Sequence, residues 1–226
     1  AELAQATGLT DGNGKGDVQI RLFRGRTEPA GWDALVRLTP RPLSTRDWRV
    51  CSFPGALNAT VAHAMARLTR PKETDIFVNL MSGSGTLLIE RLAQMGVQAA
   101  IGVEIDTQQI ACTQRNLAAA RVGLRAHLLQ ADVRSVPLAD GCADALCADL
   151  PFGQRVGSHS ENERLYPFIF AEAARIARRN ALFTVLTHEV MLAETLLKAQ
   201  SAWRIRRVLP LNLRGLHPRL YVLERV

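Results

Sequence analysis

Four consecutive residues, Asp149-Leu150-Pro151-Phe152, follow the apolar segment 143–148 and carry the most specific chemical signal in the sequence. A carboxylate and a backbone carbonyl that a proline holds in place can accept both N–H bonds of an exocyclic amine on a nucleobase. This localises the nitrogen lone pair and makes the amine a better nucleophile. The ring of Phe152 can stack on a base that has left its helix or loop. We therefore expect these four residues to form the catalytic part of a site.

A second signal is a glycine turn between a strand-like run at 76–80 and a helix-like run that begins at Thr86. Glycines let the backbone approach a ligand closely, and the N-terminus of the following helix attracts a negative group. A dinucleotide fingerprint would need a third glycine at Leu88, and no Gly-Lys-Ser/Thr follows, so neither a nicotinamide site nor a P-loop is favoured. The candidate cofactor-binding residues in this turn are Asn79, Met81, Ser82, Gly83, Ser84, Gly85 and Thr86.

Two further carboxylates follow strand-like runs. Glu104 ends the run 99–104, about twenty residues after the glycine turn, where an acidic residue can accept the ribose hydroxyls of an adenosine cofactor. Asp132 follows the run 126–130 and could accept an adenine amino group. Asp106 is better suited to cap the next helix. The neighbours Ile105 and Val133 complete this part of the predicted cofactor site.

The elements that must position these residues alternate between strand-like and helix-like segments from residue 76 to residue 200. Repeated βα units predict a parallel sheet. The runs 203–211 and 220–225 have no helix between them, which predicts an antiparallel last strand. We expect a Rossmann-like α/β fold with a seven-stranded, mostly parallel sheet and helices on both faces.

The N-terminal region has a different composition. Residues 18–22 and 32–38 suggest a strand pair, and a basic connector rich in proline and arginine follows. We therefore expect two parts, an N-terminal β segment with a basic linker at 1–50 and the catalytic domain at 51–226.

The chain has 226 residues, a net charge of +7 and a pI near 9.9, which favours a nucleic acid as partner. Of its 28 basic residues 25 are arginine, so a genome composition bias is an alternative explanation. Six arginines against one acid occur at both 37–70 and 202–226, and they could form a phosphate track beside the pocket or a solvated surface. The candidate RNA-binding residues are Arg46, Arg49, Arg155 and Arg214.

The four cysteines, Cys51, Cys112, Cys142 and Cys147, do not have the spacing of a zinc site. We expect free thiols in a reducing cytoplasm and no metal. No apolar run is long enough to span a bilayer, so no membrane association is expected. The chain begins without a secretory signal and without Met, which suggests a cytoplasmic fragment of a longer protein.

Taken in order, the motifs resemble those of class I S-adenosylmethionine-dependent methyltransferases that modify exocyclic amines. They are most similar to the THUMP-associated RNA methyltransferases that make N2-methylguanosine in tRNA. The similarity continues past the catalytic motif through 153–158 and Asn162 to Leu165-Tyr166-Pro167, and it covers roughly residues 40–210. The resemblance implies S-adenosylmethionine as cofactor, S-adenosylhomocysteine as product and a guanine in tRNA as substrate.

Two departures from the family pattern stand out. The glycine turn usually begins with Asp-Pro, whereas here it begins with Asn79-Leu80. A THUMP domain would precede this chain, because residues 1–50 are too short to form one. In such families the helix before the glycine turn approaches the cofactor, which makes Asn58 a further candidate cofactor contact.

Other functions remain open at this stage. Adenine-N6 methyltransferases of DNA or RNA and protein glutamine methyltransferases share both main motifs, but Leu150 stands where they usually carry a proline. A guanine-N2 methyltransferase acting on rRNA is a second alternative. A non-catalytic RNA-binding module with a degenerate fold is a third, and it predicts a damaged cofactor site, which the intact glycine turn argues against.

Overall fold

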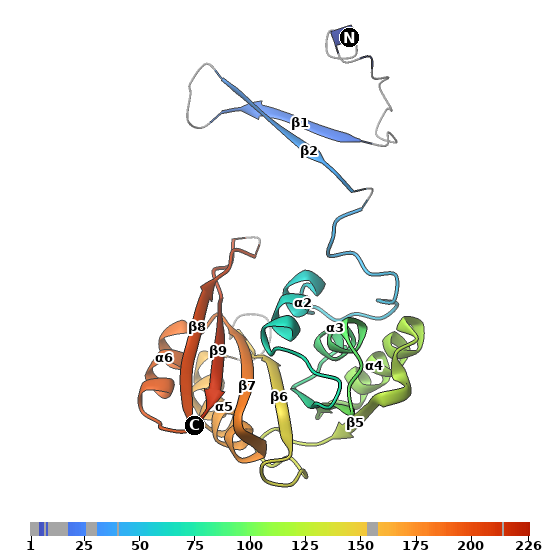
Figure 1. Ribbon diagram of the computed structural model, residues 1–226. Helices are drawn as coiled ribbons and strands as arrows, with labels where there is room; N and C mark the ends of the chain where they lie inside the picture. Colours follow the sequence, from blue (N-terminus) through green and yellow to red (C-terminus); the bar gives the residue numbers. More distant parts are fainter. Residues whose placement is uncertain are drawn as a thin grey trace. The chain divides into compact units, whose positions relative to one another are not determined.

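The computed structural model describes residues 5–6, 8, 18–25, 31–39, 41–152, 158–213 and 215–226. It divides the chain into two compact units, Ala1–Thr45 and Arg46–Val226 (Figure 1).

The first unit contains an antiparallel pair of strands, as expected from its sequence. Strand β1 (Gln19–Arg24) pairs with β2 (Trp32–Arg37), and Gln19 lies opposite Arg37. All twelve residues of the two strands are exposed, so this pair has no buried face of its own.

The second unit is built on a seven-stranded sheet of order β5-β4-β3-β6-β7-β9-β8. Strands β3 to β7 are parallel, and β9 runs antiparallel to both β7 and β8. The predicted mostly parallel sheet with an antiparallel last strand is therefore confirmed. The strands are β3 (Ile76–Leu80), β4 (Ala99–Glu104), β5 (Ala126–Gln130), β6 (Ala143–Asp149), β7 (Ala177–Thr187), β8 (Trp203–Pro210) and β9 (Arg219–Arg225).

Helices cover both faces of the sheet (Figure 1). The helices α2 (Ala59–Leu68), α3 (Thr86–Gln94) and α4 (Thr107–Ala120) pack on one face around a core that includes Phe77 and Leu88. The helices α5 (His159–Ile176) and α6 (Val190–Lys198) pack on the other face around Tyr166 and Phe183. The alternation of strand and helix therefore gives the three-layer arrangement expected from the sequence.

Local sequence sets several element ends. Asp106 caps α4 by accepting from the backbone N–H of Gln108 at 2.7 Å, as predicted. The Asn58 side chain caps α2 in the same way, by accepting from Thr60 at 2.9 Å. Helix α5 ends at Ile176, and strand β7 begins directly after it at Ala177.

Among the described residues, no helix is long and apolar enough to cross a membrane. The same part of the chain contains no group of three His, Cys, Asp or Glu residues able to hold a metal ion.

Candidate active site

Strand register brings the predicted site residues to one edge of the sheet. Leu80 of β3 lies between Val103 of β4 and Ala148 of β6. The carboxyl ends of these three strands are therefore adjacent, and Glu104 and Asp149 stand there on either side of the glycine turn. Ligands of open α/β sheets bind at this edge.

The glycine turn follows β3 directly, and its backbone is left-handed at Met81, Gly83 and Gly85, with φ of 55°, 57° and 81°. A Cβ atom at Gly85 would lie 2.5 Å from the side chain of Thr113, so only glycine fits there. Helix α4 holds the turn in place. Thr113 Oγ1 donates to the Gly83 carbonyl at 2.7 Å, and Asn116 Nδ2 donates to the Ser84 carbonyl at 2.9 Å.

The turn also presents buried polar atoms. Asn79 is fully buried and donates to the Leu80 and Cys147 carbonyls, but its Oδ1 has no hydrogen-bond partner among the described residues. Ser82 Oγ is likewise buried and unpartnered within the described chain. Buried polar atoms of this kind are normally satisfied by a ligand or by water. The turn therefore fits the polar amino-acid part of an S-adenosylmethionine-type cofactor.

Glu104 ties the second strand to this turn. Its Oε2 accepts from the backbone N–H of Gly83 at 2.8 Å, and its Oε1 accepts from Ile105 and Asp106 at 2.9 and 3.1 Å. A carboxylate offers about four acceptor positions, so about one remains for a ribose hydroxyl. Glu104 is thus both a support of the turn and a candidate ligand-binding group.

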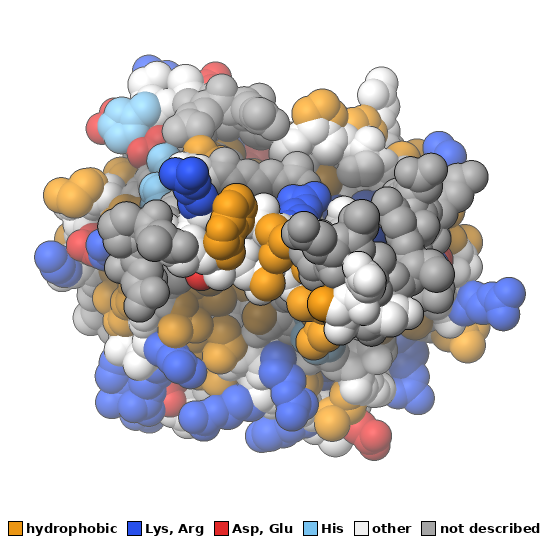
Figure 2. Space-filling view, turned by 90° about the horizontal axis from the view of Figure 1, so that it is seen from above, with side chains coloured by type: hydrophobic (Ala, Val, Ile, Leu, Met, Phe, Trp, Pro, Cys, Tyr) orange, Lys and Arg blue, Asp and Glu red, His pale blue; other side chains and the backbone are white. Residues whose placement is uncertain are grey.

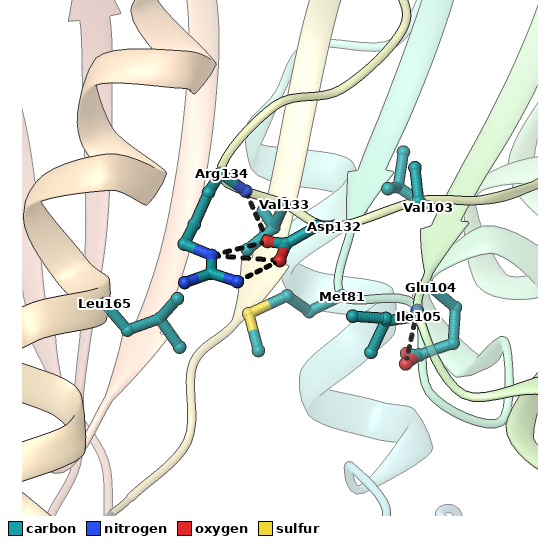
Figure 3. Close-up of a pocket in the computed structure, with 9 residues that line it drawn as sticks. Met81, Val103, Glu104, Ile105, Asp132, Val133, Arg134 and Leu165 are labelled. Atoms are coloured by element: carbon teal, nitrogen blue, oxygen red, sulfur yellow. Dashed lines mark hydrogen bonds and ion pairs between the residues drawn. The ribbon is translucent and has the colours of Figure 1, made fainter.

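A cavity of about 200 Å³ lies beside the turn (Figure 3). Glu104 and Asp132 are the acids on its wall. Arg134, which the sequence did not single out, binds the Asp132 carboxylate with its guanidinium and lies toward Leu165 (Figure 3). This ion pair lowers the pKa of Asp132, so the carboxylate stays ionised. The remaining wall is largely apolar and suits a flat base; it comprises Met81, Val103, Ile105, Ala131, Val133 and Leu165.

The predicted catalytic motif, residues 149–152, follows β6, which is the neighbour of β3 in the sheet. Asp149 Oδ1 is buried without a hydrogen-bond partner among the described residues, and burial raises the pKa of this carboxyl to about 7. The backbone N–H of Leu150 donates to the Leu186 carbonyl at 2.9 Å, which fixes the loop to β7. The Phe152 ring lies 5.9 Å from the ring of His188. The loop is therefore held against the end of β7 and the residue that follows it.

Helix α5 holds the same loop from the other side. Tyr166 donates its hydroxyl hydrogen to the Pro151 carbonyl at 2.7 Å, and Asn162 Nδ2 donates to the same carbonyl at 2.9 Å. The Tyr166 hydroxyl also lies 2.8 Å from Thr187 Oγ1. With the Pro151 carbonyl occupied, the Leu150 carbonyl is left as an acceptor among the described residues. The sequence motif contains Asn162 and Tyr166, but only the fold shows what they hold.

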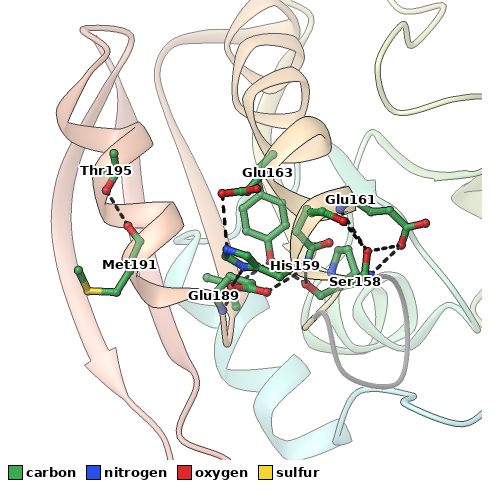
Figure 4. A network of polar contacts seen from close by, with 12 residues as sticks. Ser158, His159, Glu161, Glu163, Glu189, Met191 and Thr195 are labelled. Atoms are coloured by element: carbon green, nitrogen blue, oxygen red, sulfur yellow. Dashed lines mark hydrogen bonds and ion pairs between the residues drawn. The ribbon is translucent and has the colours of Figure 1, made fainter.

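A polar network extends this support to the start of α6 (Figure 4). Asn162 Nδ2 reaches Glu189 Oε1 at 3.4 Å, and Glu189 Oε2 pairs with His159 Nδ1 at 2.9 Å. Glu189 raises the pKa of His159, which is exposed. Ser158 and Glu161 form a reciprocal cap at the start of α5. The network therefore fixes the helix end that holds the loop 149–152.

The predicted RNA-binding arginines lie in different surroundings. Arg46 forms an ion pair with Glu90 at 2.7 Å. Arg49 donates to the Leu57 carbonyl and to Thr86 Oγ1, at 2.8 and 3.0 Å. Both side chains thus connect the segment before α2 to residues of α3. The other two candidates, Arg155 and Arg214, lie outside the described residues.

The cysteines depart from the expectation. Cys51 and Cys112 form a disulfide, so the prediction of free thiols is wrong for this pair. Cys142 and Cys147 are free. No local pattern indicates the bridge, because 61 residues separate the two cysteines and only the packing of α4 against the segment before α2 brings them together. Asn116 joins the same contact by donating to the Cys51 carbonyl at 2.9 Å.

Comparisons with known proteins agree with this geometry. Residues 46–219 match the family described as RMKL-like, methyltransferase domain. A bovine protein named tRNA (guanine(6)-N(2))-methyltransferase THUMP3 is 29% identical over 204 residues, which are 84% of this chain and 40% of that protein. The tRNA (guanine(6)-N2)-methyltransferase of Thermus thermophilus is 27% identical over 214 residues, which are 93% of this chain and 62% of that protein.

The fold has a solved counterpart. The crystal structure of TrmN from Thermus thermophilus superposes with a TM-score of 0.77 at 24% sequence identity and covers 99% of this chain and 64% of that one. The chain spans about 40% of the bovine relative and 62% of the bacterial one. Because the family match covers most of the chain and contains the whole site, the chain belongs to the RMKL-like methyltransferase domain family.

Proposed function

We propose that this protein transfers a methyl group from S-adenosylmethionine to the exocyclic N2 amine of a guanine in tRNA. The observation that carries the proposal is the buried Asp149 oxygen, which has no hydrogen-bond partner among the described residues and lies at the sheet edge that also holds the glycine turn and the cavity of about 200 Å³. The names of the bovine and Thermus relatives support guanine N2 in tRNA as the target. We assign the activity to residues 51–226, with residues 1–50 as a β segment and basic linker.

The cofactor, when bound, supplies an electrophilic methyl group on a sulfonium. Glu104 would bind the ribose, and Ile105 and Val133 would enclose the adenine. Asn79 and Ser82 would satisfy the polar amino-acid part at the glycine turn. Asp132 would accept from the adenine amine with the acceptor capacity that Arg134 leaves. Asn58 would not be needed as a direct contact, since its side chain is used by the cap of α2.

The chain's own residues prepare the amine. An ionised Asp149 and the Leu150 carbonyl would accept the two N–H bonds, which aims the nitrogen lone pair at the methyl group. Phe152, packed near His188, would stack on the flipped base. Tyr166 and Asn162 hold the loop rigid through the Pro151 carbonyl. The proton leaves late, from the methylated amine to solvent, so no strong base is needed.

We place the protein in the cytoplasm, where tRNA is modified. Disulfides are rare in that compartment, so this location implies that Cys51 and Cys112 are thiols in the cell and that their bond forms on oxidation.

The test uses the 226-residue chain, labelled S-adenosylmethionine and unmodified tRNA transcripts. After nuclease digestion, N2-methylguanosine should appear with wild type and be absent with Asp149→Ala, while both proteins bind S-adenosylhomocysteine by calorimetry. If the label is found in N6-methyladenosine instead, adenine N6 and not guanine N2 is the target. Binding of S-adenosylhomocysteine without transfer to any tRNA transcript would overturn the assignment of tRNA as substrate.

A further inference from the structure

A local irregularity in β8 places two consecutive arginines on one side of the sheet. Ile205 pairs with Leu223 of β9 and Arg207 pairs with Val222, so Arg206 is an extra residue, a β-bulge. Consecutive strand side chains normally point to opposite faces, and a bulge changes that alternation. Arg206 reaches Glu224 of β9 at 2.6 Å, and Arg206 and Arg207 line the same cleft.

The end of α2 forms the other wall of this cleft. Helix α2 lies against β7, where Thr184 Oγ1 donates to the Met65 carbonyl. Arg67 and Arg70 line the cleft from there. Arg70 has a left-handed backbone with φ of 56°, a conformation that favours glycine or asparagine at a helix end. The arginine at this position is therefore not explained by local backbone preference.

Together these residues form a cleft of about 440 Å³ with excess positive charge, which we call the arginine cleft: Arg67, Arg70, Arg206 and Arg207, with Glu224 as its acid. Glu224 is shared by Arg206 and Arg204. Arg67, Arg70 and Arg207 are exposed and have no ion-pair partner among the described residues. Guanidinium groups gathered in this way repel one another until an anion binds between them.

The arginine cleft lies beside α2, over the part of that sheet face, at β8 and β9, that helices leave open. In Figure 1, α5 and α6 lie behind β7, β8 and β9, and no labelled helix covers the front of β8 and β9. In Figure 2, Lys and Arg side chains gather along the lower edge, which is the side that faces the viewer in Figure 1.

The cleft is distant from the methyl-transfer site. Leu182 of β7 lines the cleft, whereas Leu186, four residues further along the same strand, pairs with Asp149. At about 3.3 Å per residue this separation is roughly 13 Å along the strand. A single nucleotide bound at the catalytic loop would not reach the cleft, but a polynucleotide would.

We propose that the arginine cleft binds the phosphodiester backbone of the substrate RNA while a distant nucleotide of the same molecule occupies the catalytic loop. Planar guanidinium groups match phosphate oxygens in a bidentate geometry, which explains why arginine lines both walls. This inference rests on the proposed function for the identity of the RNA, but the binding itself is separable from methyl transfer.

The test compares two variants that each remove three positive charges. The cleft variant is Arg67→Gln, Arg70→Gln, Arg207→Gln. The matched control is Arg115→Gln, Arg121→Gln, Lys198→Gln, three exposed cations without an ion-pair partner among the described residues, of which Arg121 shares the left-handed backbone of Arg70. Binding of an unmodified tRNA transcript is measured by fluorescence anisotropy from 50 to 300 mM KCl, after circular dichroism has shown that each variant is folded.

We expect the cleft variant to bind at least about tenfold more weakly than wild type and to lose about two to three units of salt-dependence slope, while the control stays near wild type. Glu224→Gln, which frees Arg204 and Arg206, should strengthen binding several-fold. Equal affinity and slope in the cleft and control variants would overturn the proposal, and so would wild-type binding without salt dependence.

Methyl transfer measured on the same proteins separates the two proposals. A raised KM with unchanged kcat in the cleft variant supports both. If wild type methylates guanine and the cleft variant binds RNA as tightly as the control variant, the cleft proposal is refuted and the proposed function stands. If the cleft variant binds RNA more weakly than the control but wild type does not methylate guanine, the proposed function is refuted and the cleft proposal stands.

Discussion

At the scale of single residues, the site depends on a carboxyl group whose environment opposes its charge. Asp149 Oδ1 is buried without a partner among the described residues, and burial raises the pKa to about 7 from an ordinary value near 3.8. The neutral form is therefore favoured by the fold, whereas the proposed reaction uses the ionised form. Function and stability should consequently depend on pH in opposite directions.

For Asp149→Asn we expect a loss of turnover of at least about a hundredfold, because the amide oxygen is a weaker acceptor and the charge is gone. In wild type, kcat/KM should fall about tenfold per pH unit below about 7, as the carboxylate is protonated. Rate–pH profiles of both proteins check this, and a flat wild-type profile between pH 5.5 and 7 would contradict it.

The same substitution should stabilise the free protein. Because the folded pKa is raised, the stability that the neutral carboxyl contributes is complete below its ordinary value and is lost as pH rises to about 7. Asp149→Asn should therefore gain of order 1–4 kcal/mol over wild type at pH 8 and much less at pH 5. Urea unfolding at the two pH values measures this difference in the free energy of unfolding. An equal difference at pH 5 and pH 8 would show that the pKa of Asp149 is ordinary.

At the scale of elements, α5 holds the proposed catalytic loop, residues 149–152, through its backbone. Asn162 and Tyr166 are four residues apart, so they share one face of the helix and meet the same Pro151 carbonyl. The cap by Ser158 and the Glu189–His159 pair fix the start of that helix (Figure 4). Loop geometry is thus set by the element that follows it in the chain.

Tyr166→Phe should lower kcat by roughly tenfold and leave S-adenosylhomocysteine affinity unchanged, because the loop loses one of its two supports. The free energy of unfolding should fall by about 1–2 kcal/mol, since the Thr187 hydroxyl loses one of its two partners and keeps only the backbone N–H of Glu189. Tyr221→Phe is the matched control: Tyr221 is equally buried, and its hydroxyl lies near Glu194 away from the loop. A similar loss of kcat in both variants would mean that Tyr166 acts only through general stability.

At the scale of the whole molecule, contacts between distant segments complete the site. The Cys51–Cys112 bond joins the segment before α2 to α4, and Asn116 connects this junction to the glycine turn. Closing a loop of this length restricts the unfolded chain and should stabilise the protein by about 4 kcal/mol.

Cys51→Ser should therefore lower the melting temperature under non-reducing conditions, and a thiol reductant should lower that of wild type to a similar value. Cys142→Ser, at a free and partly buried cysteine, serves as control and should change little. Calorimetric melts with and without dithiothreitol measure both effects. Identical wild-type melts in the two conditions would show that the bond is not formed in the purified protein.

The sequence by itself determined the order of the chemical motifs and the alternation of strand and helix. Both are local properties: a glycine turn, a carboxylate after a strand and a Pro-Phe turn are recognised within a few residues, and hydrophobic periodicity identifies each element. That was enough to predict the mostly parallel sheet and its antiparallel last strand, β9.

Only the tertiary structure decided which distant residues support or extend the site. Thr113 beneath Gly85, Tyr166 on the Pro151 carbonyl and the Cys51–Cys112 bond depend on how helices pack on the sheet, which no local pattern specifies. The arginines at the two ends of the domain were visible as clusters, but strand order and one bulge in β8 joined them into a cleft remote from the pocket. The physical reason is that side-chain contacts follow strand order and register, whereas sequence periodicity reports only which face of each element is buried.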